Sequence, residues 1–530
     1  MAPSIKNFVK KLAGSLLMVM LLAGTSLTLQ AQKKNILFIA IDDLKPTIKA
    51  YGDDYAITPV MDKLASEGYV FQNAYTQQAV CGPSRASMLT GWRPDRTKVW
   101  DLKTLIRDIN PDVVPLPEYF KQNGYTVIAT GKIYDPRSVD KQYDGVSWSE
   151  PYKPPYKLNT YYENKPPKLG YYQSPEYLAL YKRVTDSLIK NGMKPRKIDG
   201  YMRKHYKPST EKADVPDNAY EDGAIALDAI KKLDKLSKGD KPFLLMVGFK
   251  RPHLPFAAPS KYWDLYKEEE IPLAKWQKHS IGGPNVAYHT NGELRSYTDI
   301  PAYVMDKQGH IDRSIQPRLI HGYYAATSYV DTQIGKVIKA LEEKGLKDNT
   351  IIVLWGDHGW HLGDHGLWCK HTNFEQATRL PLLIIDPTKK PGETTIPVET
   401  LDIFPTLCEL AGIEPEPTLQ GKSLVPLLEG KDISQKYAIS QWPVLRKHNG
   451  MGYTIRTERY RYTEWYKDYR STEKRDPSKL VATELYDYVE DPQETKNLVY
   501  DKEYKKVLKE HEKLLHKFLD SQVGTDNPNK

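Results

Sequence analysis

The chain has little cysteine for its length: Cys81, Cys369 and Cys408 are its only cysteines among 530 residues. So small and odd a number excludes a disulfide framework as the basis of the fold. If Cys81 has another use, the remaining two could form a disulfide or stay as free buried thiols, and their spacing leaves both open. The sequon Asn-x-Ser/Thr is also absent from the sequence. Its absence favours a bacterial exported protein over an animal secretory or lysosomal one.

Dense lysine and arginine blocks, nucleic-acid-binding motifs and internal repeats are also lacking, so nucleic acid is not an expected partner. The formal charge is nevertheless +9, with a pI of about 8.9. Much of that excess fits a lysine-rich solvated surface, and it also suits an anionic partner such as a sulfated glycan or a membrane surface.

A long apolar run occurs at the N-terminus, at residues 12–29, behind Lys6, Lys10 and Lys11, and Ala31 offers a cleavage site. This pattern predicts a signal peptide over residues 1–31 and a periplasmic or secreted protein. Glycine, serine and threonine interrupt the run, which disfavours a stable membrane anchor. No cysteine lies near the cleavage site, which disfavours a lipoprotein.

Four short apolar runs predict an α/β fold with a large parallel or mixed central sheet flanked by helices. They cover residues 35–41, 127–129, 243–247 and 351–355, and a helical pattern covers residues 323–344. Polar groups follow each run, and the carboxyl ends of parallel strands meet at one edge of a sheet. We therefore expect these groups to lie together: Asp42, Asp43, Lys132, His253, Asp357 and His358.

Three of these groups, Asp42, Asp43 and Asp357, are hard oxygen ligands, and His358 could complete their site. The set predicts one divalent cation held mainly by oxygen.

Composition divides the rest of the chain. Residues 141–216 form an insertion rich in tyrosine, proline and lysine, with little regular structure at first. They are either a sugar-binding rim or a surface excursion packed by its own tyrosines. A shift near Lys431 predicts a catalytic domain over residues 32–430 and a smaller C-terminal α+β subdomain over residues 431–530.

The most informative segment is Cys81-Gly82-Pro83-Ser84-Arg85, followed by Ala86-Ser87-Met88-Leu89-Thr90-Gly91. It resembles the signature of the type I sulfatases. Five further blocks are similar to the iduronate-2-sulfatase branch of that family: residues 42–46, 77–81, 90–95, 252–256 and 356–370. The resemblance extends in blocks from about Lys34 to Leu428 and is weakest in the insertion.

The resemblance implies an alkaline-phosphatase-like sulfatase fold. It also implies conversion of Cys81 to formylglycine by a maturation enzyme, and the hydrated aldehyde then supplies the nucleophile. Calcium is the implied cation, and a sulfated glycan is the implied substrate. Metal binding then passes to Asp42, Asp43, modified Cys81, Asp357 and His358, and catalytic or sulfate-binding roles pass to Cys81, Arg85, Lys132, His253 and Lys370.

One position departs from the family pattern. Asp135 stands where the iduronate-type enzymes have a histidine, in Lys132-Ile133-Tyr134-Asp135-Pro136. An ionised carboxylate beside sulfate is unfavourable, so we expect Asp135 to point to Arg137 or Lys132, or to a substrate hydroxyl.

The resemblance leaves several substrates open. They include 2-O-sulfate on a uronic acid of a glycosaminoglycan and algal glycans such as ulvan or carrageenan. The alternatives are a phosphonate or phosphate ester hydrolase of the same superfamily, and a catalytically dead glycan-binding homologue.

Overall fold

The structure, a computed structural model, describes residues 33–165, 171–300, 310–444 and 450–525. The expected signal peptide lies outside these residues. The largest sheet they form has seven strands in the order β13-β2-β12-β8-β1-β6-β4. Their bounds are β1 Asn35–Ile41, β2 Tyr69–Phe71, β4 Thr126–Gly131, β6 Phe243–Phe249, β8 Thr350–Gly356, β12 Leu382–Ile385 and β13 Gly392–Thr394.

The sheet is mixed. Strands β4, β6, β1 and β8 are parallel neighbours, whereas β12 pairs antiparallel with both β8 and β2. All four apolar runs of the sequence lie on the parallel strands, so the expected α/β architecture is confirmed. Every residue of β1 is buried, as expected for a central strand with both faces covered.

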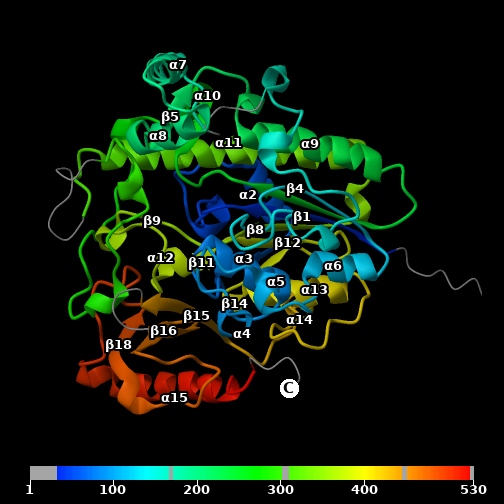
Figure 1. Ribbon diagram of the computed structural model, residues 1–530. Helices are drawn as coiled ribbons and strands as arrows, with labels where there is room; N and C mark the ends of the chain where they lie inside the picture. The colour runs from blue at the N-terminus through cyan, green and yellow to red at the C-terminus, as the bar shows by residue number, and fades with distance from the viewer. Residues whose placement is uncertain (1–32, 166–170, 301–309, 445–449, 526–530) are drawn as a thin grey trace, which may run out of the picture.

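Helices cover both faces of this sheet (Figure 1). Because side chains alternate along a strand, Leu37 and Ile39 of β1 pack with the cluster that includes helices α2, α9 and α11, while Ile36 and Phe38 pack with the cluster of α3, α6 and α13. The helix bounds are α2 Pro59–Glu67, α3 Cys81–Thr90, α6 Leu116–Gln122, α9 Glu221–Leu236, α11 Gln316–Glu343 and α13 Ile403–Leu410. The expected helix at residues 323–344 is α11, which begins one to two turns earlier.

Short elements connect these layers. The small sheets are β3 Ala74–Tyr75 with β11 Arg379–Leu380 and β14 Val398–Glu399, β5 Thr210–Ala213 with β7 Phe256–Pro259, and β9 His361–Leu362 with β10 Trp368–Cys369. The single-turn helices are α4 Pro94–Thr97, α5 Ile106–Ile109, α10 Ser260–Trp263, α12 Glu375–Thr378 and α14 Val425–Leu428.

The C-terminal part forms a second, antiparallel sheet with one long helix packed on it (Figure 1). Its strands are β15 Tyr437–Val444, β16 Gly450–Thr457, β17 Tyr460–Tyr466 and β18 Leu480–Asp487, and its helix is α15 Lys505–Ser521. Among the described residues, no helix combines the length and the apolar character that a transmembrane span requires.

The insertion begins with only 3-10 turns among the described residues up to 165, and then forms α7 (Pro175–Lys190) and α8 (Ile198–His205). Tyr172, Tyr177 and Met202 are buried in a small core of its own. This part of the insertion therefore packs on its own aromatic residues, as one of the two alternatives requires.

Asp95 is a buried carboxylate that ties the main body to the C-terminal sheet. Its Oδ1 accepts hydrogen bonds from Trp100 Nε1 and Gln441 Nε2, both at 2.8 Å. Its Oδ2 accepts from the backbone N and the Oγ of Ser471, at 2.9 and 2.7 Å, and from the Tyr453 hydroxyl. One side chain thus satisfies donors from several distant segments.

We expect Asp95→Ala to lower the free energy of unfolding by about 2–5 kcal/mol, because it leaves these buried donors without an acceptor. Chemical denaturation measures the change. The matched control is Asp108→Ala, an exposed carboxylate, which should change stability by less than about 0.5 kcal/mol. Equal stability of Asp95→Ala and the wild type would contradict this account.

Candidate active site

The carboxyl ends of β1, β4, β6 and β8 bring the predicted polar groups to one edge of the sheet. Asp42 follows β1, Lys132 follows β4 and Asp357 follows β8 directly, and His253 lies in the turn after β6. Backbone hydrogen bonds extend the sheet to these residues: Asp42 N donates to the Phe249 carbonyl at 3.1 Å, and Asp357 N to the Ile41 carbonyl at 3.2 Å. The sheet therefore fixes the positions of residues more than 300 apart in sequence.

Two glycines let β4 and β6 approach closely where Lys132 leaves the sheet. A Cβ on Gly131 would lie 2.0 Å from the Gly248 carbonyl oxygen, and one on Gly248 would lie 2.1 Å from the Lys132 carbonyl oxygen. Gly131 also has a φ of +77°, in the left-handed region that glycine adopts without strain. Lys132 N donates to the Gly248 carbonyl at 2.7 Å, so this contact places the lysine.

Cys81 is the first residue of α3 and is 1% exposed. Its Sγ lies 3.4 Å from His358 Nε2 and 3.7 Å from Asp43 Oδ1. Ser84 donates a hydrogen bond to the Asp357 carbonyl, which anchors the first turn of α3 to the end of β8. Burial raises the pKa of the Cys81 thiol well above its ordinary value, and the charge of Asp42 raises it further.

Arg85 lies one helical turn after Cys81 and is fully buried. Its Nε donates to Asp357 Oδ2 at 2.9 Å and its Nη2 to Asp42 Oδ1 at 3.0 Å. Its Nη1 donates to the carbonyls of Lys132 and Ile133, at 2.5 and 3.0 Å. The guanidinium therefore holds two carboxylates and the end of β4 in place.

Both predicted lysines bind carboxylates of the cluster. Lys132 Nζ lies 2.8 Å from each carboxylate oxygen of Asp42. Lys370 Nζ lies 2.9 Å from Asp43 Oδ2 and 3.0 Å from Glu293 Oε1, and it stands over the Trp360 ring at 4.7 Å from the centroid. The two ammonium groups thus flank the aspartate pair.

Metal-ligand atoms gather in two overlapping sets at this point: Asp42, Asp43, Cys81 and His253, and Asp43, Cys81, Asp357 and His358. Within each set all ligand atoms lie within 4.8 Å of one another. His358 Nδ1 lies 2.9 Å from the Gly359 carbonyl, and a proton there leaves the Nε2 lone pair for a ligand role. The chemistry of this set fits a divalent cation.

The charge balance fits such a cation as well. The carboxylates of Asp42, Asp43, Asp357 and Glu293 outnumber the cationic groups of Arg85, Lys132 and Lys370, and one divalent cation would reverse this excess. Burial raises the pKa of Asp43; Lys370 lowers it, Asp42 raises it again, and the result is about 7. A cation would keep this carboxylate ionised and would leave a positive site for an anionic substrate.

Glu293 is a site residue that the sequence analysis missed. Its Oε1 lies 3.4 Å from His253 Nε2 as well as 3.0 Å from Lys370 Nζ. It stands beside a 3-10 turn in a long irregular segment, where a lone glutamate carries no distinguishing pattern.

His253 Nδ1 lies 2.5 Å from the Leu254 carbonyl. Burial and Lys370 lower the pKa of His253 to about 4, against the opposing effect of Asp42.

A cavity of about 370 Å³ opens over Asp42, Lys132 and His253. This volume is in the range of small-molecule sites. The insertion supplies much of its wall. The lining residues from the insertion are Tyr143, Tyr152, Pro154, Pro155, Tyr156, Tyr171 and Arg203. The insertion thus has both features that the sequence left open, a core of its own and a rim beside the site.

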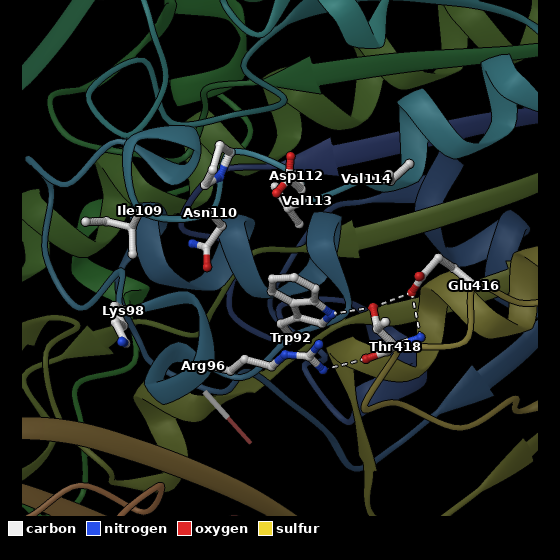
Figure 2. A pocket seen from close by; sticks show the side chains of 11 residues that line it. Trp92, Arg96, Lys98, Ile109, Asn110, Asp112, Val113, Val114, Glu416 and Thr418 are labelled. Carbon is white, nitrogen blue, oxygen red and sulfur yellow. Dashed lines mark hydrogen bonds between the residues drawn. The ribbon is translucent and has the colours of Figure 1, made fainter. Parts of the chain in front are cut away.

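A second cavity, of about 410 Å³, lies away from these residues, around Trp92 and Thr418 (Figure 2). Trp92 Nε1 donates to Thr418 Oγ1 at 3.0 Å, and Arg96 Nη1 donates to the Thr418 carbonyl at 2.7 Å. None of the predicted site residues lines it. The cavity beside Cys81 is therefore the candidate active site.

Comparison with known families matches this arrangement. The sulfatase family model matches residues 34–413, which is more than half of the chain. The chain belongs to the sulfatase family. It is accordingly a sulfuric ester hydrolase that acts on sulfate esters. A second family model, described as N-sulphoglucosamine sulphohydrolase, C-terminal, matches residues 363–521.

Among curated proteins, this sulfatase is similar to iduronate 2-sulfatase of Mus musculus, with 32% identity over 89% of this chain and 91% of the relative. It is also similar to Delta 4,5-hexuronate-2-O-sulfatase of Bacteroides thetaiotaomicron, with 27% identity over 92% of this chain and 90% of the relative. The resemblance to the iduronate-2-sulfatase branch is thus confirmed.

Among solved structures, the phosphonate monoester hydrolase of Silicibacter pomeroyi superposes with a TM-score of 0.67 at 21% identity, over 93% of this chain and 96% of that structure. This similarity shows the expected alkaline-phosphatase-like fold.

Proposed function

We propose that this sulfatase is exported and removes sulfate from a sulfated polysaccharide or from its oligosaccharides. The first candidate target is a 2-O-sulfate on a uronic acid, which the names of both curated relatives favour. Algal glycans such as ulvan or carrageenan are the second. The observation that carries the proposal is the placement of Cys81 among buried carboxylates and cations, within 4.8 Å of ligand atoms of Asp42 and His253, which line a cavity with an aromatic and cationic wall.

In this proposal Cys81 is converted to formylglycine, whose hydrated aldehyde supplies the hydroxyl that attacks sulfur. Arg85 positions Asp42 and Asp357 through its two ion pairs. Lys132 and Lys370 flank the aspartate pair and bind the sulfate oxygens as the anion enters.

His253 is proposed to hold a proton on Nε2, facing the leaving oxygen of the sugar. A bound sulfate stabilises the protonated imidazole, because opposite charges within a few Å favour the charged form. Glu293, at 3.4 Å from the same nitrogen, favours it as well.

Calcium is the proposed cation, with Asp42, Asp43, modified Cys81, Asp357 and His358 as its ligands. Bound calcium would offset negative charge on the sulfate and on the nucleophile.

The proposal also keeps the division of the chain. A catalytic domain over residues 32–430 carries the site, and a subdomain over residues 431–530 is joined to it by the hydrogen bonds that Asp95 accepts.

The matching signature at residues 81–91 is the segment that a formylglycine-generating enzyme would act on.

Sulfate release from defined substrates tests the proposal. The protein is co-expressed with a formylglycine-generating enzyme, and conversion is checked as a mass loss of about 18 Da at the peptide that contains Cys81. The panel contains 2-O-sulfated uronic acid disaccharides, ulvan and carrageenan oligosaccharides, an aryl sulfate and an aryl phosphate. We expect release from at least one glycan class and a much lower kcat/KM for the phosphate.

Two results would contradict the proposal. A higher kcat/KM for the aryl phosphate would identify a phosphate or phosphonate ester hydrolase. Glycan binding without any sulfate release by fully converted protein would identify a catalytically dead binding homologue.

A further inference from the structure

Asp135, the residue that departs from the family pattern, binds Arg137. Its Oδ1 accepts from the backbone N and from Nε of Arg137, both at 2.9 Å, and its Oδ2 accepts from Nη2 at 2.8 Å. Lys132 Nζ lies 3.5 Å from the same Oδ2. Burial raises the pKa of Asp135, but Lys132 and Arg137 outweigh it and hold the pKa below its ordinary value. Asp135 is therefore ionised, and the positive charges of Arg137 and Lys132 balance its negative charge.

Arg137 is held on one side only. The Asp135 side chain is fully buried, whereas the Arg137 side chain is 51% exposed and lines the cavity beside Lys132 and Asp42. A guanidinium has five N–H donors, and Asp135 accepts from two of its nitrogens, Nε and Nη2. Among the described residues, no other ion pair or hydrogen bond of this guanidinium is found. Its free edge is thus available to a ligand.

The other cations of the cavity wall differ in whether they already have a partner within the protein. Lys250 forms an ion pair with Glu221 at 2.7 Å, and the Arg251 side chain donates to backbone carbonyls and lies over Tyr171. Arg203 projects from α8, is exposed, and has no ion pair within the part of the chain that the structure describes. Arg203 therefore has no ion pair among the described residues, and Arg137 has one, to Asp135, with its side chain 51% exposed.

We propose that Arg137, oriented by Asp135, binds with Arg203 an anionic group of the substrate other than the sulfate that is removed. This inference rests on the proposed function and adds to it the chemical class of substrate: a sulfated sugar with a second anion close to the scissile sulfate. That anion is a carboxylate of a uronic acid or a second sulfate ester. Both present paired oxygens that a guanidinium fork binds through two parallel hydrogen bonds.

The position of the pair explains why a carboxylate is tolerated so near a sulfate site. Asp135 holds Arg137 at the cavity wall, next to the lysine that we assign to the sulfate. Its charge is balanced by Arg137, so Arg203 adds a net positive charge to the wall. A neutral sugar could stack on Tyr171 or Tyr156 of the same cavity, but it would leave the Arg137 fork without a partner.

The test compares matched substrates on converted wild-type protein. They are a 2-O-sulfated uronic acid, the same sugar with the carboxylate reduced to an alcohol, and a neutral sugar with two sulfates. We expect kcat/KM to be about 10- to 100-fold higher for a substrate with a second anion, as for one charge-assisted hydrogen-bonded contact. A preference for the carboxylate or for the second sulfate identifies the source of the anion.

Variants test whether Arg137 and Asp135 cause the preference for a substrate with a second anion. Arg137→Gln should reduce this ratio towards one, mainly through KM. Asp135→Asn should have a similar effect, and the double variant should be no worse than the more severe single one, because Asp135 acts through Arg137. The control is Lys153→Gln, an exposed cation of the same insertion outside the cavity, which should keep the wild-type ratio.

Active wild-type protein without a preference for the second anion would overturn the inference and leave the proposed function standing. Equal losses on charged and neutral substrates in Arg137→Gln would also overturn it, since they indicate a structural role. Wild-type protein that releases no sulfate from any substrate, with conversion of Cys81 verified, would instead refute the proposed function.

Discussion

Cys81→Ala is expected to lower sulfate release by at least about 10⁴-fold, the size of effect seen when an enzyme loses its nucleophile. The side chain is small and lies at the start of a helix, so its removal should cost only about 1 kcal/mol of stability. Sulfate release and thermal unfolding, measured side by side, separate the two effects. The same variant should also lack the mass loss of about 18 Da.

The matched control is Cys408→Ala. Cys408 is a free, buried cysteine of α13 with no role in the proposed site, so this variant should retain most of the activity. Activity of Cys81→Ala near the wild-type level, with an unchanged melting curve, would refute the assignment of the nucleophile.

Removal of the divalent cation has the second large expected effect. A chelator should abolish turnover, because four carboxylates would then face an anionic substrate with only three cations. Stability gives a readout that is independent of activity. A cation at 100 times its Kd should raise the free energy of unfolding by about 2.7 kcal/mol. Titration of calcium into metal-free protein, followed by thermal unfolding, measures this shift.

Asp43→Asn should lose the calcium-dependent shift, since it weakens one of the central ligands. The control is Glu464→Gln, because Glu464, Glu512 and His516 form the other cluster with metal-ligand spacing among the described residues. His516 already binds Glu464 at 2.9 Å, so we expect the calcium response to persist in this variant. Full turnover by a metal-free preparation would exclude the proposed site.

The sequence predicted those parts of the molecule that depend on local pattern. The apolar run of residues 35–41 is strand β1 without a change of bounds. The groups after the strands meet because parallel neighbours share an edge, which follows from strand direction alone. Asp135 contacts Arg137 and Lys132, two of the three alternatives expected for it.

What the sequence did not reveal depends on packing between distant segments. Glu293 and Arg203 lie outside any motif, and only the fold brings Glu293 to Lys370 and Arg203 to the cavity around residues 42 and 132. The sequence also left the state of Cys369 and Cys408 open, and the structure has both as free, buried cysteines. A tertiary contact made by a single residue leaves no periodic pattern in the sequence from which it could be predicted.

The burial of Cys81 has a consequence for the order of events in the cell. All ten residues of α3 are buried, and β6 and β8, which complete the site, are synthesised about 160 and 270 residues after Cys81. In the proposed maturation, an enzyme that oxidises this cysteine would therefore have to reach it before the chain folds. Oxidation and folding would then compete in time, and a molecule that folds first would keep an unmodified, buried thiol.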